Sequence, residues 1–397
     1  MKNKGWSHLR GWITLLCCAV MTLFAGSAQA EEGERVDSTA RSAVLIERET
    51  GKVLLSCNSR EKLPMASTTK IMTALVALEY GKLDEIVTVG RNAYGVPGTS
   101  IYLNLGEKIT LRDLLYGLML ASGNDAAVAI AEHIGGDVET FCRMMTKRAE
   151  ELGCSDTVFL TPHGLPKDGH YTTAHDLAII AREAMNHELF REIVSTKRAS
   201  ISWEGRSYQR ILNNKNRLLT DYDGATGIKT GYTKAAGRCL VFGAKRNGLE
   251  LIGVVLRCGD WFDEAARLMD ETFARFESVT MMQQGDAIAS IPVKGSNTES
   301  VSVVMSDDLS GVIRQGAVPS VEISIPETLK APVRRGDIIG TAYMIAGGEV
   351  VSSCDIISET DAPGNEPLPR WQQIWHNWLL IHSKRPENMS PGASLCG

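Results

Sequence analysis

Residues 66–74 read Ala66-Ser67-Thr68-Thr69-Lys70-Ile71-Met72-Thr73-Ala74, and the fold of the chain can be worked out from this stretch. Apolar residues recur at helical spacing as far as Tyr80, so we expect a helix with Ser67 just ahead of it as a possible N-cap. A spacing of three puts Ser67 and Lys70 within side-chain reach in the first turn. The pattern therefore brings a hydroxyl and an amine together at a predicted helix start.

Two further motifs follow in order along the chain, Ser122-Gly123-Asn124 and Lys229-Thr230-Gly231. The first lies between predicted helices at 111–119 and 126–133, and the second leads into a segment that we expect to form sheet. Each motif alone occurs by chance in many chains and would mark only a cap or a turn. Together they form the S-x-x-K, S-x-N and K-T-G set, each part in a suitable structural context.

Acyl transfer explains why these residue types are needed together. A serine hydroxyl is a poor nucleophile until a nearby base takes its proton, and Lys70 can be that base for Ser67. The pKa of Lys70 must then fall from about 10.4 toward neutrality, which burial and the neighbouring cation Lys229 would both promote. The second lysine therefore has a predicted function of its own.

The remaining motif residues can be given roles in the same chemistry. Ser122 could relay a proton to the leaving amine, and the backbone N–H groups of Ser67 and Tyr232 could stabilise the developing oxyanion. A substrate carboxylate would bind Lys229 and Thr230, as an exopeptidase requires. The predicted catalytic residues are Ser67, Lys70 and Ser122, and the predicted substrate-binding residues are Asn124, Lys229, Thr230, Gly231 and Tyr232.

No metal or other cofactor is expected. The histidines are not accompanied by a His-Glu-x-x-His motif, and the cysteines include no CxxC pair. Because the chain is too long to need a disulfide scaffold, we expect most cysteines to be buried free thiols.

The chain divides, by its patterns, into four parts. Residues 1–30 read as a cleavable secretory signal, and their removal changes the formal net charge from −5 to −8, because three basic residues and no acidic ones are lost. An acidic mature chain argues against a nucleic-acid partner. Hairpins, among them one at Asn247-Gly248, and a helix at 262–276 complete a first domain at 31–277. Alternating strands predict an all-β domain at 278–362.

The last part, 363–397, holds a linker, a helical segment and a tail. Between Pro369 and Lys384, Trp371, Trp375 and Trp378 lie on one wide apolar face with basic residues at both ends. That composition favours a helix at the membrane surface, too short to span the bilayer. The alternative is a helix docked on the protein itself.

With their neighbours, the three motifs resemble those of the low-molecular-mass D-Ala-D-Ala carboxypeptidases. The likeness runs from about Ala43 to Phe276 and includes 98–103, 161–165 and 172–178. It implies an α+β fold of the penicilloyl-serine transferase (β-lactamase/transpeptidase-like) kind, with a five-stranded antiparallel sheet flanked by helices, followed by a smaller β domain. The signal and the C-terminal segment together predict export to the outer face of the cytoplasmic membrane or the cell wall.

The resemblance further implies a substrate and an inhibitor. The substrate is a peptidoglycan stem peptide ending in D-Ala-D-Ala. Its penultimate residue forms an ester with Ser67, and the last alanine is released. β-Lactams imitate that dipeptide and leave Ser67 blocked. A class A β-lactamase would carry a Glu-x-x-x-Asn for deacylation, and this chain has none. A DD-endopeptidase acting on cross-links and a non-catalytic penicillin-binding sensor remain as alternatives.

Overall fold

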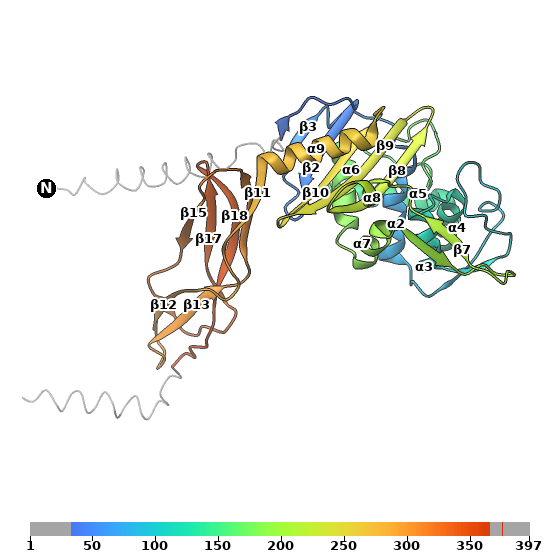
Figure 1. Ribbon diagram of the computed structural model, residues 1–397. Helices are drawn as coiled ribbons and strands as arrows, with labels where there is room; N and C mark the ends of the chain where they lie inside the picture. Colours follow the sequence, from blue (N-terminus) through green and yellow to red (C-terminus); the bar gives the residue numbers. More distant parts are fainter. Residues whose placement is uncertain (1–32, 366–374, 376–397) are drawn as a thin grey trace, which may run out of the picture. The chain divides into compact units, whose positions relative to one another are not determined.

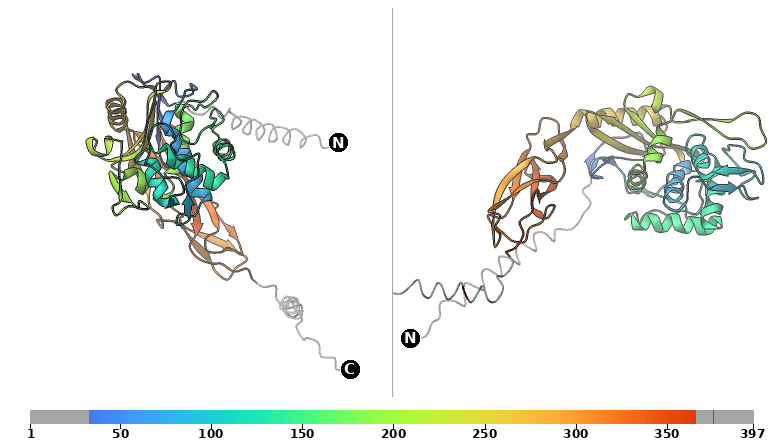
Figure 2. Two further views of the ribbon diagram at one scale, coloured as in Figure 1. Left: turned by 90° about the vertical axis from the view of Figure 1, so that its right-hand side faces the viewer. Right: turned by 90° about the horizontal axis from the view of Figure 1, so that it is seen from below.

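The computed structural model describes residues 33–365 and residue 375 of the 397-residue chain. Within this part the chain forms two compact units that meet in the sequence between Ser278 and Val279. Figures 1 and 2 show a first unit of sheet and helices and a second unit of strands. The predicted signal segment and, apart from Trp375, the predicted C-terminal helix lie outside the described residues.

An antiparallel sheet forms the centre of the first unit, with strand order β1-β3-β2-β10-β9-β8. The five longer strands pair antiparallel as the family resemblance implies, and the two-residue β1 adds a parallel edge. Asn247-Gly248 makes the predicted tight turn, with positive φ at both residues. The strands are β1 (Glu34–Arg35), β2 (Ser42–Glu47), β3 (Val53–Cys57), β8 (Ala225–Thr233), β9 (Gly237–Arg246) and β10 (Leu249–Leu256).

Helices cover both faces of this sheet, so strand β2 is buried along its whole length. Helix α9, the predicted last helix, packs on one face and α6 on the other (Figure 1). The helices of this unit are η1 (Ala66–Thr69), α2 (Lys70–Tyr80), α3 (Leu111–Met119), α4 (Asn124–Gly135), α5 (Val138–Glu151), α6 (Ala174–Ala184), α7 (Glu188–Ser195), α8 (Leu218–Asp221) and α9 (Trp261–Arg275).

Helix α2 lies at the centre of the apolar core, and residues 70–77 are all buried. It contacts α3, α4 and α5 of the helical part and α6 beneath the sheet. Two small hairpins border the helical part, β4 (Ile86–Thr88) with β5 (Lys108–Thr110) and β6 (Arg198–Ile201) with β7 (Arg210–Asn213). The helix that begins at Lys70 therefore connects the helical part to the sheet.

The second unit is all-β over its described residues, as predicted. Its main sheet has the order β15-β17-β18-β13-β12-β16, and β11 pairs with β14. The α+β class with a separate β domain is thereby confirmed. The strands are β11 (Phe276–Met282), β12 (Ala287–Lys294), β13 (Ser300–Met305), β14 (Leu309–Arg314), β15 (Ser320–Ser324), β16 (Leu329–Lys330), β17 (Ile338–Ala346) and β18 (Glu349–Ser358).

The described cysteines are all free thiols. Four of them are buried, Cys142, Cys154, Cys239 and Cys258, and burial raises the pKa of each thiol. They pack as small apolar side chains, in line with the sequence-based expectation.

Candidate active site

Ser67 lies inside a 3-10 turn, η1, that runs directly into α2, and the expectation that it caps the helix is wrong. The residue before α2 is Thr69, whose backbone is already helical, and neither helix start has a side-chain cap. An N-cap hydroxyl would be occupied by a backbone N–H. The Ser67 hydroxyl instead lies 3.0 Å from the amine of Lys70.

Lys70 is fully buried, and its Nζ has three partners. Besides Ser67 Oγ it lies 2.8 Å from Asn124 Oδ1 and 2.7 Å from the carbonyl oxygen of His163. A neutral amine has two hydrogens and one lone pair. Because the amide and carbonyl oxygens can only accept, they take the two hydrogens and leave the lone pair for the Ser67 hydroxyl. The geometry therefore suits a lysine that receives a proton from Ser67.

The surroundings also favour the neutral form of this lysine. Burial lowers the pKa of Lys70 well below its usual value, and the charges of Lys229 and Lys215 lower it further. Among the described residues, the partners of its Nζ at hydrogen-bond distance are all neutral, and the charge of Asp125, which raises the pKa, is the smallest of the contributions. The expected effect of Lys229 on Lys70 is thus present in the structure.

Lys229 and Thr230 lie on β8, an edge strand of the sheet that faces the Ser67 turn. Lys229 is 1% exposed, its Nζ donates to the Thr230 carbonyl at 3.1 Å, and burial lowers its pKa to about 7. Lys215 adds its charge from the segment after β7, and burial lowers its pKa too. Sequence reasoning did not find Lys215, because no motif contains it.

Gly231 marks the closest approach between β8 and the Ser67 turn. A Cβ at this position would lie 2.9 Å from the Ser67 nitrogen and 3.0 Å from the Thr68 nitrogen. Those are backbone atoms, so a larger residue could fit only if the strand or the turn moved. Glycine is needed here for the approach itself.

We expect Gly231→Ala to lower kcat/KM by about 10²-fold or more, because a displacement of about 1 Å between reacting groups has that effect. The measurement is D-alanine release from a Lys-D-Ala-D-Ala peptide, with thermal unfolding to check the fold. Gly259→Ala is the matched control, since its Cβ would meet no atom within 4 Å. A Gly231→Ala variant as active as Gly259→Ala would contradict the close-approach argument.

Asn124 contacts Lys70 from the start of α4, and Ser122 lies two residues before it in the α3–α4 connection. Ser122 is buried with φ of 63°, and its carbonyl accepts a hydrogen bond from the Thr99 hydroxyl. Asn124 begins α4, and besides accepting from Lys70 it donates to the Pro97 carbonyl at 2.6 Å. Its amide therefore holds Lys70 in place and keeps one N–H for a ligand.

Asp125 shapes the loop that runs past Ser122 and Asn124. Its buried carboxylate accepts from the Ser100 hydroxyl at 2.6 Å and from the backbone N–H groups of Ile101 and Leu103 at 3.1 Å. These bonds fold residues 100–103 against the start of α4. These contacts give a structural reason for the family resemblance of residues 98–103.

Tyr232 lies farther along β8, with 62% of its surface exposed, opposite Arg238 of β9. Because β8 is an edge strand, part of its backbone N–H and C=O groups remain available to a ligand. The backbone of His163 was not predicted as a site element. The family resemblance at residues 161–165 pointed to this segment but assigned no role to the His163 carbonyl.

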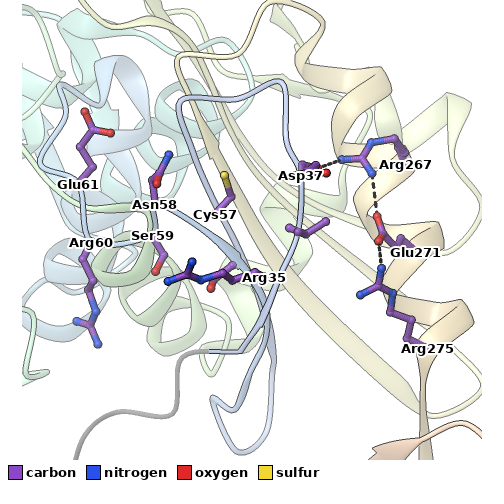
Figure 3. A pocket seen from close by; sticks show the side chains of 12 residues that line it. Arg35, Asp37, Cys57, Asn58, Ser59, Arg60, Glu61, Arg267, Glu271 and Arg275 are labelled. Carbon is purple, nitrogen blue, oxygen red and sulfur yellow. Dashed lines mark hydrogen bonds and ion pairs between the residues drawn. The ribbon is translucent and has the colours of Figure 1, made fainter.

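The described residues contain no cluster of histidine, cysteine, aspartate or glutamate suited to a metal. A separate cavity of about 820 Å³ lies between β1, the 57–61 segment and α9 (Figure 3), and no motif residue lines it. Along α9, Arg267 donates to the Asp37 carbonyl, and Glu271 pairs with Arg267 and Arg275. The Arg267–Asp37 bond and an ion pair between Arg275 and Glu34 of β1 attach the N-terminal segment to α9, whereas the Glu271 pairs lie within the helix.

A serine hydroxyl against a buried lysine whose pKa lies well below its usual value, beside an edge strand that carries a second lysine, is the arrangement of an acyl-transferring serine enzyme. Residues 27–259 match the family described as D-alanyl-D-alanine carboxypeptidase, and residues 276–363 match the penicillin-binding protein 5 C-terminal domain. The chain therefore belongs to the D-alanyl-D-alanine carboxypeptidase family.

Relatives of known sequence are similar over most of the chain. D-alanyl-D-alanine carboxypeptidase DacF of Bacillus subtilis is 35% identical over 363 residues, covering 88% of this chain and 93% of that protein. D-alanyl-D-alanine carboxypeptidase DacC of Escherichia coli is 32% identical over 386 residues, covering 91% and 95%.

Solved structures are similar as well. Penicillin binding protein 5 from Haemophilus influenzae has a TM-score of 0.69 at 30% identity, over 83% of this chain and 98% of that one. A mutant of the Streptomyces K15 DD-transpeptidase has a TM-score of 0.58 at 35% identity, over 60% of this chain and 99% of that one.

Proposed function

We propose that the chain is an exported serine D-Ala-D-Ala carboxypeptidase that removes the terminal D-alanine from peptidoglycan stem peptides. The observation that carries this proposal is the buried Lys70 amine, whose Nζ lies 3.0 Å from Ser67 Oγ and within 2.8 Å of two oxygens that can only accept. Residues 31–277 would form the catalytic domain and 278–362 the β domain.

The proposed reaction begins at Ser67. Its Oγ–H proton passes to Lys70 Nζ while Oγ bonds to the carbonyl carbon of the penultimate D-alanine. The N–H groups of Ser67 and Tyr232 stabilise the oxyanion. As the peptide C–N bond breaks, a proton passes from Lys70, through Ser122, to the leaving amine. Water then attacks the ester carbonyl and gives a proton to Lys70. The bond between that carbon and Ser67 Oγ breaks, Lys70 returns the proton to Oγ, and the shortened peptide is released.

Lys229 and Thr230 are the proposed site for the free carboxylate of the departing D-alanine. The rest of the peptide must then extend from the acylated serine away from Lys229, toward the far end of β8. A cavity of about 570 Å³ opens on that side, lined in part by Ala66, Thr233 and Ala235. A chain end at Lys229 and open space beyond Thr233 suit an exopeptidase.

The pH dependence of KM tests the role of Lys229. With a pKa of about 7, Lys229 loses its charge as the pH rises, so KM for the peptide is expected to increase by up to about tenfold per pH unit above 7. Lys229→Arg keeps its charge and should show a flat KM up to pH 9. Steady-state D-alanine release from pH 5 to 9 measures this, with the exposed Lys234→Arg as control. A wild-type KM that does not change with pH would contradict the assignment.

β-Lactams are the proposed inhibitors. The expelled group of a β-lactam stays tethered to the acyl-enzyme, and the chain lacks the Glu-x-x-x-Asn that drives deacylation in class A β-lactamases. We therefore expect the peptide acyl-enzyme to clear and the penicillin acyl-enzyme to persist.

Mass spectrometry of cell-wall peptides incubated with the purified protein tests the proposed function. Loss of one alanine from pentapeptide stems supports a carboxypeptidase, whereas cleavage of cross-linked dimers would favour a DD-endopeptidase. Labelling by penicillin without any peptide turnover would favour a sensor, and turnover of nitrocefin would identify a β-lactamase.

We further propose that residues 369–384 bind the outer face of the cytoplasmic membrane. The support is the sequence pattern of tryptophans with basic ends. No helix of the part that the structure describes is long and apolar enough to cross a bilayer. Truncation before Pro369 is expected to leave D-alanine release unchanged and to lower recovery with liposomes of anionic lipid. Equal recovery of both forms would reject this anchor.

A further inference from the structure

The backbone just before the nucleophile is held in a conformation that it would not adopt by itself. Ala66 has φ of 50°, in the left-handed region that residues with a Cβ disfavour. The Ala66 carbonyl and the Ser67 side chain share this turn, so their positions are linked. Contacts from elsewhere must therefore stabilise the turn, as is common at functional sites.

Two neighbours meet the carbonyl oxygen of Ala66. The Thr69 hydroxyl lies 2.8 Å from it and donates to it. Gly164 packs against the same oxygen so closely that a Cβ there would lie 1.8 Å away. The carbonyl is thus fixed by one hydrogen bond and by a glycine of the 161–165 segment.

The Thr69 hydroxyl has a second partner, Nε2 of His170, at 3.0 Å. The other ring nitrogen, Nδ1, is 3.0 Å from the backbone N–H of Leu160 and must accept from it. In a neutral ring the proton is then on Nε2. His170 therefore donates to Thr69, and Thr69 can use its own proton only toward Ala66.

The surroundings of His170 favour the neutral form of its ring. It is 6% exposed, and its ring meets the Phe159 ring edge-on at a centroid distance of 6.0 Å. Burial and the nearby Lys167 lower its pKa to about 4, so the ring stays neutral over the range in which Lys70 works. The chain of donors thus runs in one direction, from Leu160 to Ala66.

We propose that His170 is a positioning residue for acylation: through the Thr69 hydroxyl it holds the Ala66 carbonyl, and with it the turn that presents Ser67 to Lys70. The inference rests on the proposed function and extends it to a residue outside the three motifs. The segment that carries His170 also supplies the His163 carbonyl to Lys70. The 160–170 segment thereby positions both the nucleophile and its base.

The test is a double-mutant cycle on acylation by a fluorescent penicillin, with the rate constant k2 and the binding constant K determined separately. His170→Phe and Thr69→Val should each lower k2 by about 10- to 100-fold and leave K within about threefold. Because both substitutions interrupt the same series of hydrogen bonds, the double variant His170→Phe/Thr69→Val should be no slower than the slower single variant. His170→Gln, which can still donate to Thr69, should recover most of the rate.

A structural role alone would give a different result. Full k2 in folded His170→Phe, or additive losses in the double variant, would overturn the proposal. If His170→Phe fails to fold, the His170→Gln and Thr69→Val variants still test the proposal. A Thr69→Val variant with wild-type k2 would reject the proposed hydrogen-bond chain from His170 to Ala66. His133→Phe is the matched control, because His133 is partly exposed and pairs with Glu85. A wild-type protein that is acylated but releases no D-alanine would refute the proposed function and leave this test intact.

Discussion

Ser67→Ala is expected to lower D-alanine release by at least about 10⁴-fold and to abolish covalent labelling by a fluorescent penicillin. The bond that forms in the first step has Ser67 Oγ as one of its atoms, and without it no ester can exist. Losses of that size follow removal of the nucleophile in other serine enzymes. The measurements are D-alanine release from a diacetylated Lys-D-Ala-D-Ala peptide and gel fluorescence after labelling.

The fold should survive this change. The Ser67 hydroxyl contacts Lys70, and its loss leaves the amine two acceptors for its two hydrogens. Thermal unfolding of Ser67→Ala is therefore expected to stay within a few degrees of the wild type. Ser207→Ala, at an exposed position between β6 and β7, is the control and should keep full activity. Labelling that persists in Ser67→Ala would place the nucleophile elsewhere.

Lys70→Met is expected to lower the acylation rate by about 10³- to 10⁴-fold, in the upper part of the range for loss of general base catalysis. Methionine fills a similar apolar volume but cannot accept the Ser67 proton. Removing a fully buried amine relieves its desolvation, while Asn124 and the His163 carbonyl each lose a donor. We expect these effects on stability to offset each other in part.

The Lys70→Arg variant distinguishes a role of Lys70 as proton acceptor from a role of a positive charge at this position. Arginine stays protonated in proteins, so this variant places a permanent cation with hydrogen-bond donors at the site but cannot take a proton. It should be as slow in acylation as Lys70→Met. Lys82→Met, at a side chain that is 86% exposed, is the control. Acylation by Lys70→Arg at more than about a tenth of the wild-type rate would show that Lys70 acts through its charge.

The local parts of the site could be predicted well. Ser67 and Lys70 are three residues apart on one turn, so their contact follows from helical geometry whatever the rest of the chain does. The Asn247-Gly248 hairpin and the strands of the β domain followed from patterns of the same local kind. The N-cap expectation failed because residues 66–69 form a 3-10 turn that packs against Gly164 and Gly231, and these contacts with distant segments are not visible in the local pattern.

The partners of the site were harder to predict because they are backbone groups or lie outside the motifs. The carbonyls of Pro97 and His163 carry no side-chain signature, yet they fix Asn124 and Lys70. Lys215 acts through its charge from a segment with no motif. Such contacts depend on how distant segments pack, which a single sequence does not show.

By itself, the sequence predicted which side chains carry the proposed chemistry, because three ordered motifs name them and short-range geometry places Ser67 beside Lys70. Only the tertiary structure decided whether Lys70 can work as a base. A lysine loses its proton when it is buried and when other cations lie close, and both conditions come from elements far apart in the chain. The same packing brings Gly231 against Ser67 and places two oxygen acceptors beside the amine of Lys70.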